Sequence, residues 1–247
     1  MALATASGPA AVAWLGKRPD GSFAWWSYAL FAQWHMLVPP YYLAKRRARR
    51  RTHGEPVYTR VRDGWWIGGW PSAPEATPGG EHPPPQRPAA ESDAGEAGKR
   101  RGGRPARRRA PAAASVAEDG GAGVPRPAIL DCTAELARRV FDAPAYLCLP
   151  IFDCGAPTVA QLDEAVEWAA AQRALGREVL VHCANGHGRS ATVLAACLLA
   201  EGAARAPADA EAAMKAVRPL VKINAAQGAS LDMWWAKRNG LGAAAAE

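Results

Sequence analysis

Short apolar segments alternate with helical segments from Ala128 to Trp235, and this alternation restricts the fold more than any other feature of the chain. Thr158 and Gln161 have the spacing of a capping box at the start of one helical segment. Strands that alternate with helices predict an α/β fold with a central, mostly parallel sheet flanked by helices. The expected strands are a pair within 56–70, then 128–133, 145–153 and 178–183, and the expected helices are 158–176, 190–202, 208–217 and one that begins near Asn224.

Residues 71–126 differ in composition from the rest of the chain. They hold ten of the 21 prolines and contain no aromatic residue, leucine or isoleucine. Such a segment buries too little apolar area to offset the entropy of ordering it, so we predict a long disordered insertion. Its arginine run, GKRRGGRPARRRA, is interpreted either as a binding site for RNA or anionic lipid or as a solvated low-complexity segment. Because no aromatic residues for base stacking lie among the arginines, we favour the second interpretation and expect no nucleic-acid partner.

The first 56 residues are predicted to form an N-terminal segment that anchors the protein to a membrane. Residues 23–44 contain no Asp, Glu, Lys or Arg, and about 20 apolar residues suffice to cross a bilayer as a helix. The basic run 45–51, KRRARRR, follows directly, as the aromatic-belt and positive-inside patterns require. Gln33, His35 and the pair Pro39–Pro40 argue against a span, and the alternative is a segment that packs on the domain or lies in the interface. We expect the rest of the chain on the cytoplasmic side.

The net charge and the cysteine content bear on the partners and the cellular compartment of the protein. The formal net charge of +7 suits acidic partners such as phosphorylated substrates or an anionic membrane surface. The five cysteines are scattered, without the spacing of a disulfide framework or a zinc site. We therefore expect reduced thiols in an intracellular protein, with no metal and no other cofactor.

One loop gathers reactive residue types between an expected strand and an expected helix. It reads HCANGHGRS, from His182 to Ser190. In α/β sheets, ligands bind at the carboxyl ends of strands and at helix N-termini. Gly186 and Gly188 let the backbone curl so that successive N–H groups point at one centre. Arg189 offers two parallel donors to the oxygens of a phosphate, so the loop is predicted to bind phosphate.

Cys183 lies at the base of this loop. The converging N–H groups and the helix dipole lower the pKa of such a thiol, which favours a thiolate at neutral pH. A thiolate beneath a bound phosphate is placed for in-line attack and a cysteinyl-phosphate intermediate. Ser190 is a donor that can stabilise the sulfur as it leaves, and His182 can orient the loop through backbone hydrogen bonds. The pattern therefore predicts a phosphomonoester hydrolase.

The segment VHCANGHGRSATV resembles the active-site motif of cysteine-dependent protein tyrosine and dual-specificity phosphatases: His-Cys, five residues, Arg, and Ser or Thr. The resemblance extends from Gly64 to about Trp235 and suits the compact plant and bacterial dual-specificity-like type. It implies a single phosphatase domain over 57–237 that carries the insertion 71–126, followed by a flexible tail, 238–247. Family members take a general acid from a loop some thirty residues upstream of the cysteine. Asp153, thirty residues before Cys183, holds that position.

The loop residues also bear on the substrate. Those expected to bind the phosphate or the rest of the substrate are Ala184, Asn185, Gly186, His187, Gly188 and Arg189. The phosphotyrosine-recognition loop of the large tyrosine phosphatases is not visible, so the resemblance implies a shallow pocket for phosphotyrosine in proteins, with phosphoserine and phosphothreonine as further substrates. Relatives that act on inositol lipids often carry lysines in this loop, and His187 takes one of those positions. A phosphoinositide phosphatase at a membrane surface is therefore the alternative, and an RNA-directed phosphatase or RNA-binding protein is the third hypothesis.

A second cysteine leaves one question open. Cys154 lies beside the expected general acid. Its thiol either forms a protective disulfide with Cys183 under oxidation or is inert.

Overall fold

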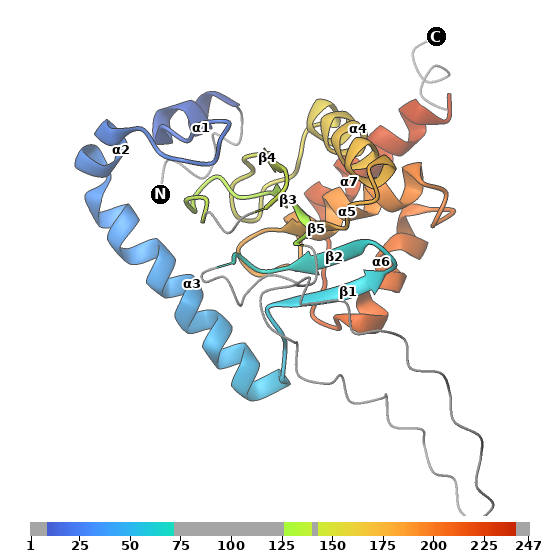
Figure 1. The fold of residues 1–247 in the computed structure, drawn as a ribbon, viewed down its shortest axis with the longest axis horizontal. Helices are drawn as coiled ribbons and strands as arrows, with labels where there is room; N and C mark the ends of the chain where they lie inside the picture. Colours follow the sequence, from blue (N-terminus) through green and yellow to red (C-terminus); the bar gives the residue numbers. More distant parts are fainter. Residues whose placement is uncertain (1–8, 72–125, 140–142, 241–247) are drawn as a thin grey trace, which may run out of the picture.

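The computed structural model describes residues 9–71, 126–139 and 143–240. Its centre is a five-stranded sheet with the order β1-β2-β5-β3-β4 (Figure 1). The first two strands pair antiparallel, and the remaining pairs are parallel. The predicted α/β fold with a mostly parallel sheet is therefore confirmed. The strands are β1 (Tyr58–Arg62), β2 (Trp65–Gly68), β3 (Ala128–Asp131), β4 (Tyr146–Cys148) and β5 (Val179–His182).

The strand expected over 145–153 is shorter in the structure, because β4 ends at Cys148. Pro150 has no N–H to offer a sheet ladder. The carbonyl of Ile151 instead accepts a hydrogen bond from Arg189 at 2.8 Å. The backbone after β4 therefore binds Arg189, next to the phosphate loop, and does not extend the strand.

Four helices pack on one face of the sheet (Figure 1). The helix that begins at Arg189 is buried along nearly its whole length, which explains its apolar sequence. Thr158 and Asn224 each begin a helix with a complete capping box, so the box predicted from Thr158 and Gln161 is present. The helices are α4 (Val159–Ala174), α5 (Arg189–Ala200), α6 (Pro207–Val217) and α7 (Ala225–Arg238).

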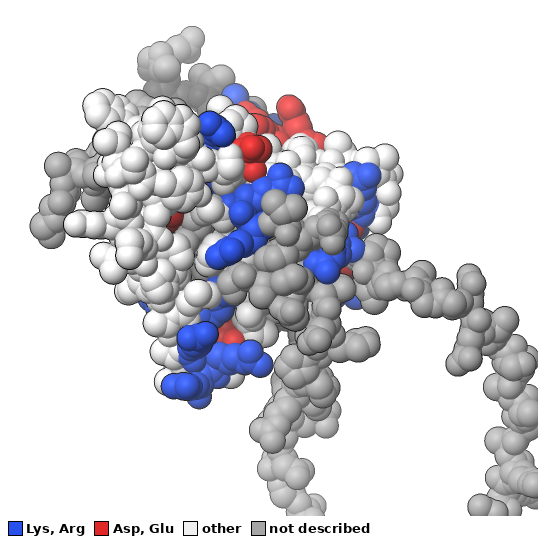
Figure 2. All heavy atoms as spheres, turned by 60° about the vertical axis from the view of Figure 1, so that its left-hand side comes forward, with Lys and Arg blue, Asp and Glu red and all other residues white. Residues whose placement is uncertain are grey.

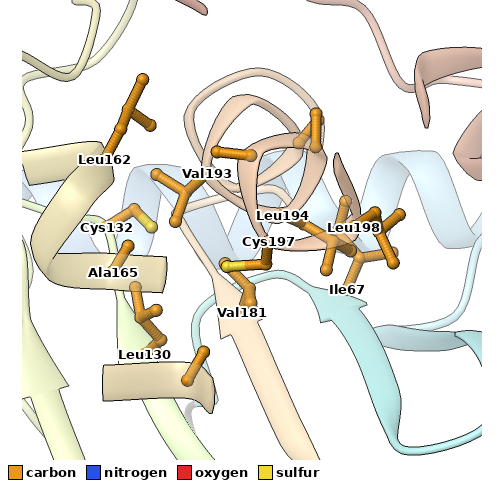
Figure 3. Packing of buried hydrophobic residues seen from close by; sticks show 14 of the residues in the cluster. Ile67, Leu130, Cys132, Leu162, Ala165, Val181, Val193, Leu194, Cys197 and Leu198 are labelled. Carbon is orange, nitrogen blue, oxygen red and sulfur yellow. The ribbon is translucent and has the colours of Figure 1, made fainter. Parts of the chain in front are cut away.

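The core lies between the sheet and these helices. Side chains of β2, β3 and β5 interlock with those of α4 and α5 (Figure 3). Burial on this scale contributes about 1.5–3 kcal/mol for each large aliphatic side chain. It fixes β5 against α5 and with them the loop between the two. The residues at the centre of this packing include Ile67, Leu130, Leu162, Ala165, Val181, Val193, Leu194, Cys197 and Leu198.

The N-terminal segment forms three helices: α1 (Pro9–Leu15), α2 (Trp25–Leu30) and α3 (Ala32–His53). The long helix α3 runs on the opposite side of the molecule from α4–α7 (Figure 1). It joins the second half of the apolar segment 23–44 to the basic run 45–51, and it continues through Pro39 and Pro40. Within the ranges that the structure describes, no helix is both long enough and apolar enough to cross a membrane.

Lys17 fastens the N-terminal segment to the sheet. Its ammonium group is buried and lies 3.2 Å from a carboxylate oxygen of Asp131, at the end of β3. It also donates to the carbonyl of Thr133 at 2.8 Å and to the carbonyl of Leu136. A lysine seldom becomes buried without such partners, so the helices before β1 are docked on the sheet by a specific polar contact.

Two predictions fall largely outside the described residues. The disordered insertion 71–126 is one of them, because only its first and last residues are described. The flexible tail 238–247 is the other: Arg238 is the last residue of α7, and residues 241–247 are not described.

Candidate active site

The loop 183–188 connects β5 with α5 and lies against the end of β2. The N–H of Cys183 donates to the carbonyl of Gly68 at 3.3 Å. Gly186 has a φ of +78°, and a Cβ at this position would lie 2.5 Å from the carbonyl carbon of Gly68. Because no side chain fits there, the loop needs glycine both for its backbone angle and for its contact with β2.

Arg218 holds the outer side of this loop. Its guanidinium donates to the carbonyl of Gly186 at 3.0 Å and to the carbonyl of Asn185 at 2.9 Å. It also lies 3.1 Å from Glu55, and its side chain is buried. These carbonyls are turned towards Arg218, while the N–H of Gly186 points the other way, towards Cys183. Arg218 therefore positions the backbone donors of the loop.

Cys183 is the sulfur at the centre of the loop. The N–H of Gly186 lies 3.2 Å from its Sγ, and the hydroxyl of Ser190 lies 3.3 Å from it. Burial by itself raises the pKa of this thiol. The positive charge of Arg189 and the hydrogen bonds from Ser190 outweigh burial, so the pKa of Cys183 lies below its ordinary value. The structure thus favours the thiolate that the sequence predicts.

Arg189, the first residue of α5, is held in place from two sides. Its two terminal nitrogens lie 2.7 and 2.8 Å from the carboxylate oxygens of Glu135. One of these nitrogens also lies 3.0 Å from Asp153. Such a bidentate pair fixes the plane of the guanidinium. Arg189 is therefore oriented before any ligand arrives.

Asp153 lies next to Arg189 of the loop region, although it precedes Cys183 by thirty residues in the sequence. Its carboxylate meets Arg189 on one oxygen, and its other oxygen accepts a hydrogen bond from the hydroxyl of Tyr42 at 2.8 Å. Burial by itself raises the pKa of this carboxyl. The charge of Arg189 and the Tyr42 hydrogen bond outweigh burial and hold the pKa of Asp153 below its ordinary value.

The beginning of α7 supports the segment that follows Asp153. The side-chain amide of Asn224 donates to the carbonyl of Cys154 at 2.9 Å, and that of Gln227 donates to the carbonyl of Gly155 at 2.9 Å. Gln227 also packs against Gly188: a Cβ at Gly188 would lie 2.9 Å from the amide oxygen of Gln227. One helix end therefore ties the aspartate loop to the cysteine loop. Cys154 itself is exposed and has a φ of +63°.

His182 lies behind the loop rather than in it. Its Nδ1 is 3.4 Å from the carbonyl of Cys183, and its Nε2 is 3.8 Å from Asp131. Burial lowers the pKa of His182 below its ordinary value, although the charge of Asp131 opposes this. The ring therefore contacts the backbone at Cys183, and its role in orienting the loop stays a prediction.

The three variable loop positions have different surroundings. The methyl group of Ala184 is buried against Tyr42 and neighbouring apolar side chains. The ring of His187 lies 2.5 Å from Glu55 through its Nε2. Burial lowers the pKa of His187 below its ordinary value, against the opposing effect of Glu55. Asn185 has a buried side-chain oxygen that meets no hydrogen-bond partner among the described residues.

Four residues that build this site lie outside the sequence motif. They come from distant segments of the chain: Tyr42 lies 111 residues before Asp153, and Glu135 lies 54 residues before Arg189. A single acidic or aromatic residue far from the motif looks like any other before the chain is folded. The four are Tyr42, Glu135, Arg218 and Gln227.

Comparison with known proteins gives a result that agrees with this geometry. Residues 117–230 match a family model described as PTP-SAK, a Swiss Army Knife protein with a DSP-PTPase phosphatase domain. An uncharacterized protein, MJECL20 of Methanocaldococcus jannaschii, is 49% identical over 49 residues, which are 20% of this chain and 33% of that protein. Phosphatidylglycerophosphate phosphatase PTPMT1 of Arabidopsis thaliana is 35% identical over 74 residues, 30% of this chain and 22% of that protein. The chain thus aligns with one third or less of each of these relatives.

A solved structure shares the fold. It is PTPMT1 in complex with PI(5)P, with a TM-score of 0.50 and 17% identity, over 74% of this chain and 97% of that one. The fold, the family match and the motif at Cys183 and Arg189 agree. The match over residues 117–230 identifies a phosphatase domain of the dual-specificity and protein tyrosine phosphatase family.

Proposed function

We propose that the protein is a phosphomonoester hydrolase that works through a cysteinyl-phosphate intermediate. The Sγ thiolate of Cys183 attacks phosphorus, so that an S–P bond forms as the bond to the leaving oxygen breaks. The loop N–H groups and Arg189 bind the three remaining phosphate oxygens, where negative charge builds up. Asp153, in its protonated form, gives its proton to the leaving oxygen.

The second step returns the enzyme to its starting state. Asp153 is now a carboxylate and takes a proton from a water molecule that attacks phosphorus. The S–P bond breaks, inorganic phosphate leaves, and the thiolate is restored. The hydroxyl of Ser190, 3.3 Å from Sγ, stabilises the negative charge that returns to sulfur.

One observation carries this proposal: the sulfur of Cys183 has two hydrogen-bond donors and shares its loop with a guanidinium that Glu135 already orients. Hydrolysis of p-nitrophenyl phosphate tests it. Replacing Cys183 by Ser should abolish turnover, while Cys197→Ala, a buried cysteine of α5 outside the site, should keep it. Asp153→Asn should lower turnover most for substrates with poor leaving groups. Equal activity of the Cys183→Ser variant would rule the thiolate mechanism out.

The first candidate substrate is phosphotyrosine in proteins, with phosphoserine and phosphothreonine as further substrates. It follows from membership of the phosphatase family. A phosphopeptide panel tests it: phosphate should be released from phosphotyrosine peptides by the wild type and not by Cys183→Ser. Release from none of the peptides would remove this candidate.

A phosphorylated lipid is the second candidate, and a feature of the N-terminal helices favours it. An open groove of about 710 Å³ lies where α2 meets α3 and is lined by mostly apolar residues, among them Leu30, Leu37 and Val38. Val38 also packs against the apolar cluster that contains Ala184 of the loop. An apolar groove that is linked through Val38 to the cluster around Ala184 suits a lipid, and the name of the Arabidopsis relative agrees with it. A panel of short-chain phosphoinositides and phosphatidylglycerophosphate, run beside the peptides, separates the two candidates.

We also propose that the N-terminal helices dock on an anionic membrane. Large apolar side chains of α2 and α3 are exposed, including Trp25, Leu30, Met36 and Leu37. Arginines at the end of α3 are exposed as well. Figure 2 shows this side with the Lys and Arg side chains gathered next to a broad uncharged area. Apolar area and positive charge together are what an interfacial helix needs to bind anionic lipid.

Sedimentation with vesicles tests the docking. The protein should pellet with vesicles that contain phosphatidylglycerol and much less with phosphatidylcholine alone. Replacing Trp25, Leu30 and Leu37 by Ser should release it, whereas Met233→Ser, an exposed apolar residue of α7, should not. Equal pelleting of both variants would refute the docking surface.

A further inference from the structure

One side of α3 lies along the candidate active site. Tyr42 donates to Asp153, and together with Val38 it packs on the apolar cluster around Ala184. Arg46 and Arg49 follow Tyr42 by four and seven residues, which places them on the same side of the helix. The helix therefore carries a row of side chains from the general-acid position towards the outer edge of the loop.

Arg46 and Arg49 have donors that no acceptor uses. Nε and Nη2 of Arg46 and Nη1 of Arg49 are buried and have no hydrogen-bond partner within the described ranges. Glu55, whose carboxylate feels the charge of Arg49, already binds His187 and Arg218. A buried guanidinium nitrogen without an acceptor is costly, because it has lost water and gained nothing in exchange.

The charges around Arg46 also show that its guanidinium lacks a negatively charged partner. Burial, and then the positive charge of Arg218, lower the pKa of the Arg46 guanidinium to about 10. Arg46 is therefore still a cation at neutral pH, and it lies close to a second cation. Arg218 in turn donates to the carbonyl of Asn185 in the loop, so the charge of Arg46 acts on a residue that contacts the phosphate-binding loop.

We propose that Arg46 and Arg49 bind a second phosphate group of the substrate while the first lies in the Cys183 loop. The ligand is a small polyol headgroup that carries a phosphomonoester and a phosphodiester. Its phosphodiester oxygens accept from the unused guanidinium donors and offset the positive charge beside Arg218. This proposal rests on the proposed phosphatase activity and assigns its specificity to a helix outside the matched range 117–230.

A phospholipid headgroup fits this subsite better than a phosphopeptide does. Arg46 lies one helical turn beyond Tyr42, and Tyr42 contacts Asp153 beside the Cys183 loop, so one compact group that carries both phosphates fits the two anion sites. The other side of α3 exposes apolar residues such as Leu37 and Tyr41. A headgroup bound on the inner side leaves its acyl chains free to run along that apolar surface.

The test compares two soluble substrates. Glycerophosphoglycerol phosphate carries both groups, and glycerol 3-phosphate carries only the phosphomonoester. In the full chain, Arg46→Gln combined with Arg49→Gln should lower the ratio of kcat/KM for the first over the second by about tenfold or more, since hydrogen bonds to charged groups are lost. Arg47→Gln, an exposed arginine of the same helix, should leave the ratio unchanged. An unchanged ratio in the double variant would overturn the proposal.

Further measurements separate the outcomes. Vesicles that contain phosphatidylglycerophosphate should show the same loss as the soluble headgroup; a loss on vesicles alone would mean that the arginines bind the bilayer, which overturns the proposal. A change of ratio for doubly over singly phosphorylated peptides, without one for the headgroup, would assign the subsite to peptides and overturn it too. Calorimetric binding of the headgroup to the Cys183→Ser protein, with and without the two arginines, decides the subsite even if no phosphomonoester is hydrolysed.

Discussion

The hydroxyl of Tyr42 has one measurable consequence at the scale of a single residue. It donates to Asp153 and is one cause of the lowered pKa of that carboxyl. In Tyr42→Phe the donor is lost and the pKa of Asp153 rises. A general acid with a higher pKa stays protonated to a higher pH, so the descending limb of the kcat/KM profile should move to higher pH.

A pH profile with p-nitrophenyl phosphate measures this shift. Tyr28→Phe is the matched control, because Tyr28 is half exposed and belongs to α2. A descending limb that stays in place in Tyr42→Phe would mean that another group supplies the proton.

Residues within one local motif could be predicted, and residues that reach the site from elsewhere could not. Cys183, Arg189 and Ser190 follow from spacing alone, since the eight consecutive residues 183–190 fix their mutual positions. Asp153 needed the family resemblance in addition. Glu135 and Tyr42 depend on how β3 and α3 pack, which no local pattern encodes.

At the scale of elements, the loop 183–188 depends on its contact with β2. Gly186 combines a left-handed φ with a Cβ position 2.5 Å from the backbone of Gly68. Gly186→Ala should therefore displace the loop and remove a donor from Cys183, which we expect to lower kcat/KM by about a hundredfold.

The control variant Gly176→Ala separates the effect of the steric clash with β2 from the effect of a left-handed backbone angle. Gly176 has a similar φ of +72°, but nothing lies within 4 Å of its Cβ position. It should lose some thermal stability while kcat/KM is kept. Equal loss of activity in the two variants would show that the β2 contact does not matter.

Elements with a regular pattern were predicted well, and those shaped by tertiary contacts were not. The capping box at Thr158 marked the start of α4 correctly. The strand expected up to residue 153 ends at Cys148, because the following backbone binds Arg189. Pro39 and Pro40 argued against a membrane span, and α3 passes through both prolines into the basic run.

For the whole molecule, the buried pair of Lys17 and Asp131 joins the N-terminal helices to the sheet. Removing one partner of a buried ion pair typically costs about 3–5 kcal/mol. Lys17→Met should therefore lower the free energy of unfolding by about that amount at pH 7, measured by urea denaturation. Lys222→Met, at an exposed position, is the control.

The difference in unfolding free energy between the wild type and Lys17→Met should become smaller in acid, because the negative charge of Asp131 causes this difference. Although burial opposes it, Lys17 is the main reason why the pKa of Asp131 falls from 3.8 to about 2. In the wild type, the stability gained from this lowered pKa is present above 3.8 and is lost as the pH falls towards 2. In Lys17→Met the carboxyl of Asp131 keeps its hydrogen bonds from Thr133 and Tyr146 but loses the charge of Lys17, so its pKa is higher than in the wild type. Protonation then relieves its burial cost as the pH falls. The two unfolding free energies should converge below pH 4, and a constant difference would show that Lys17 acts through packing rather than charge.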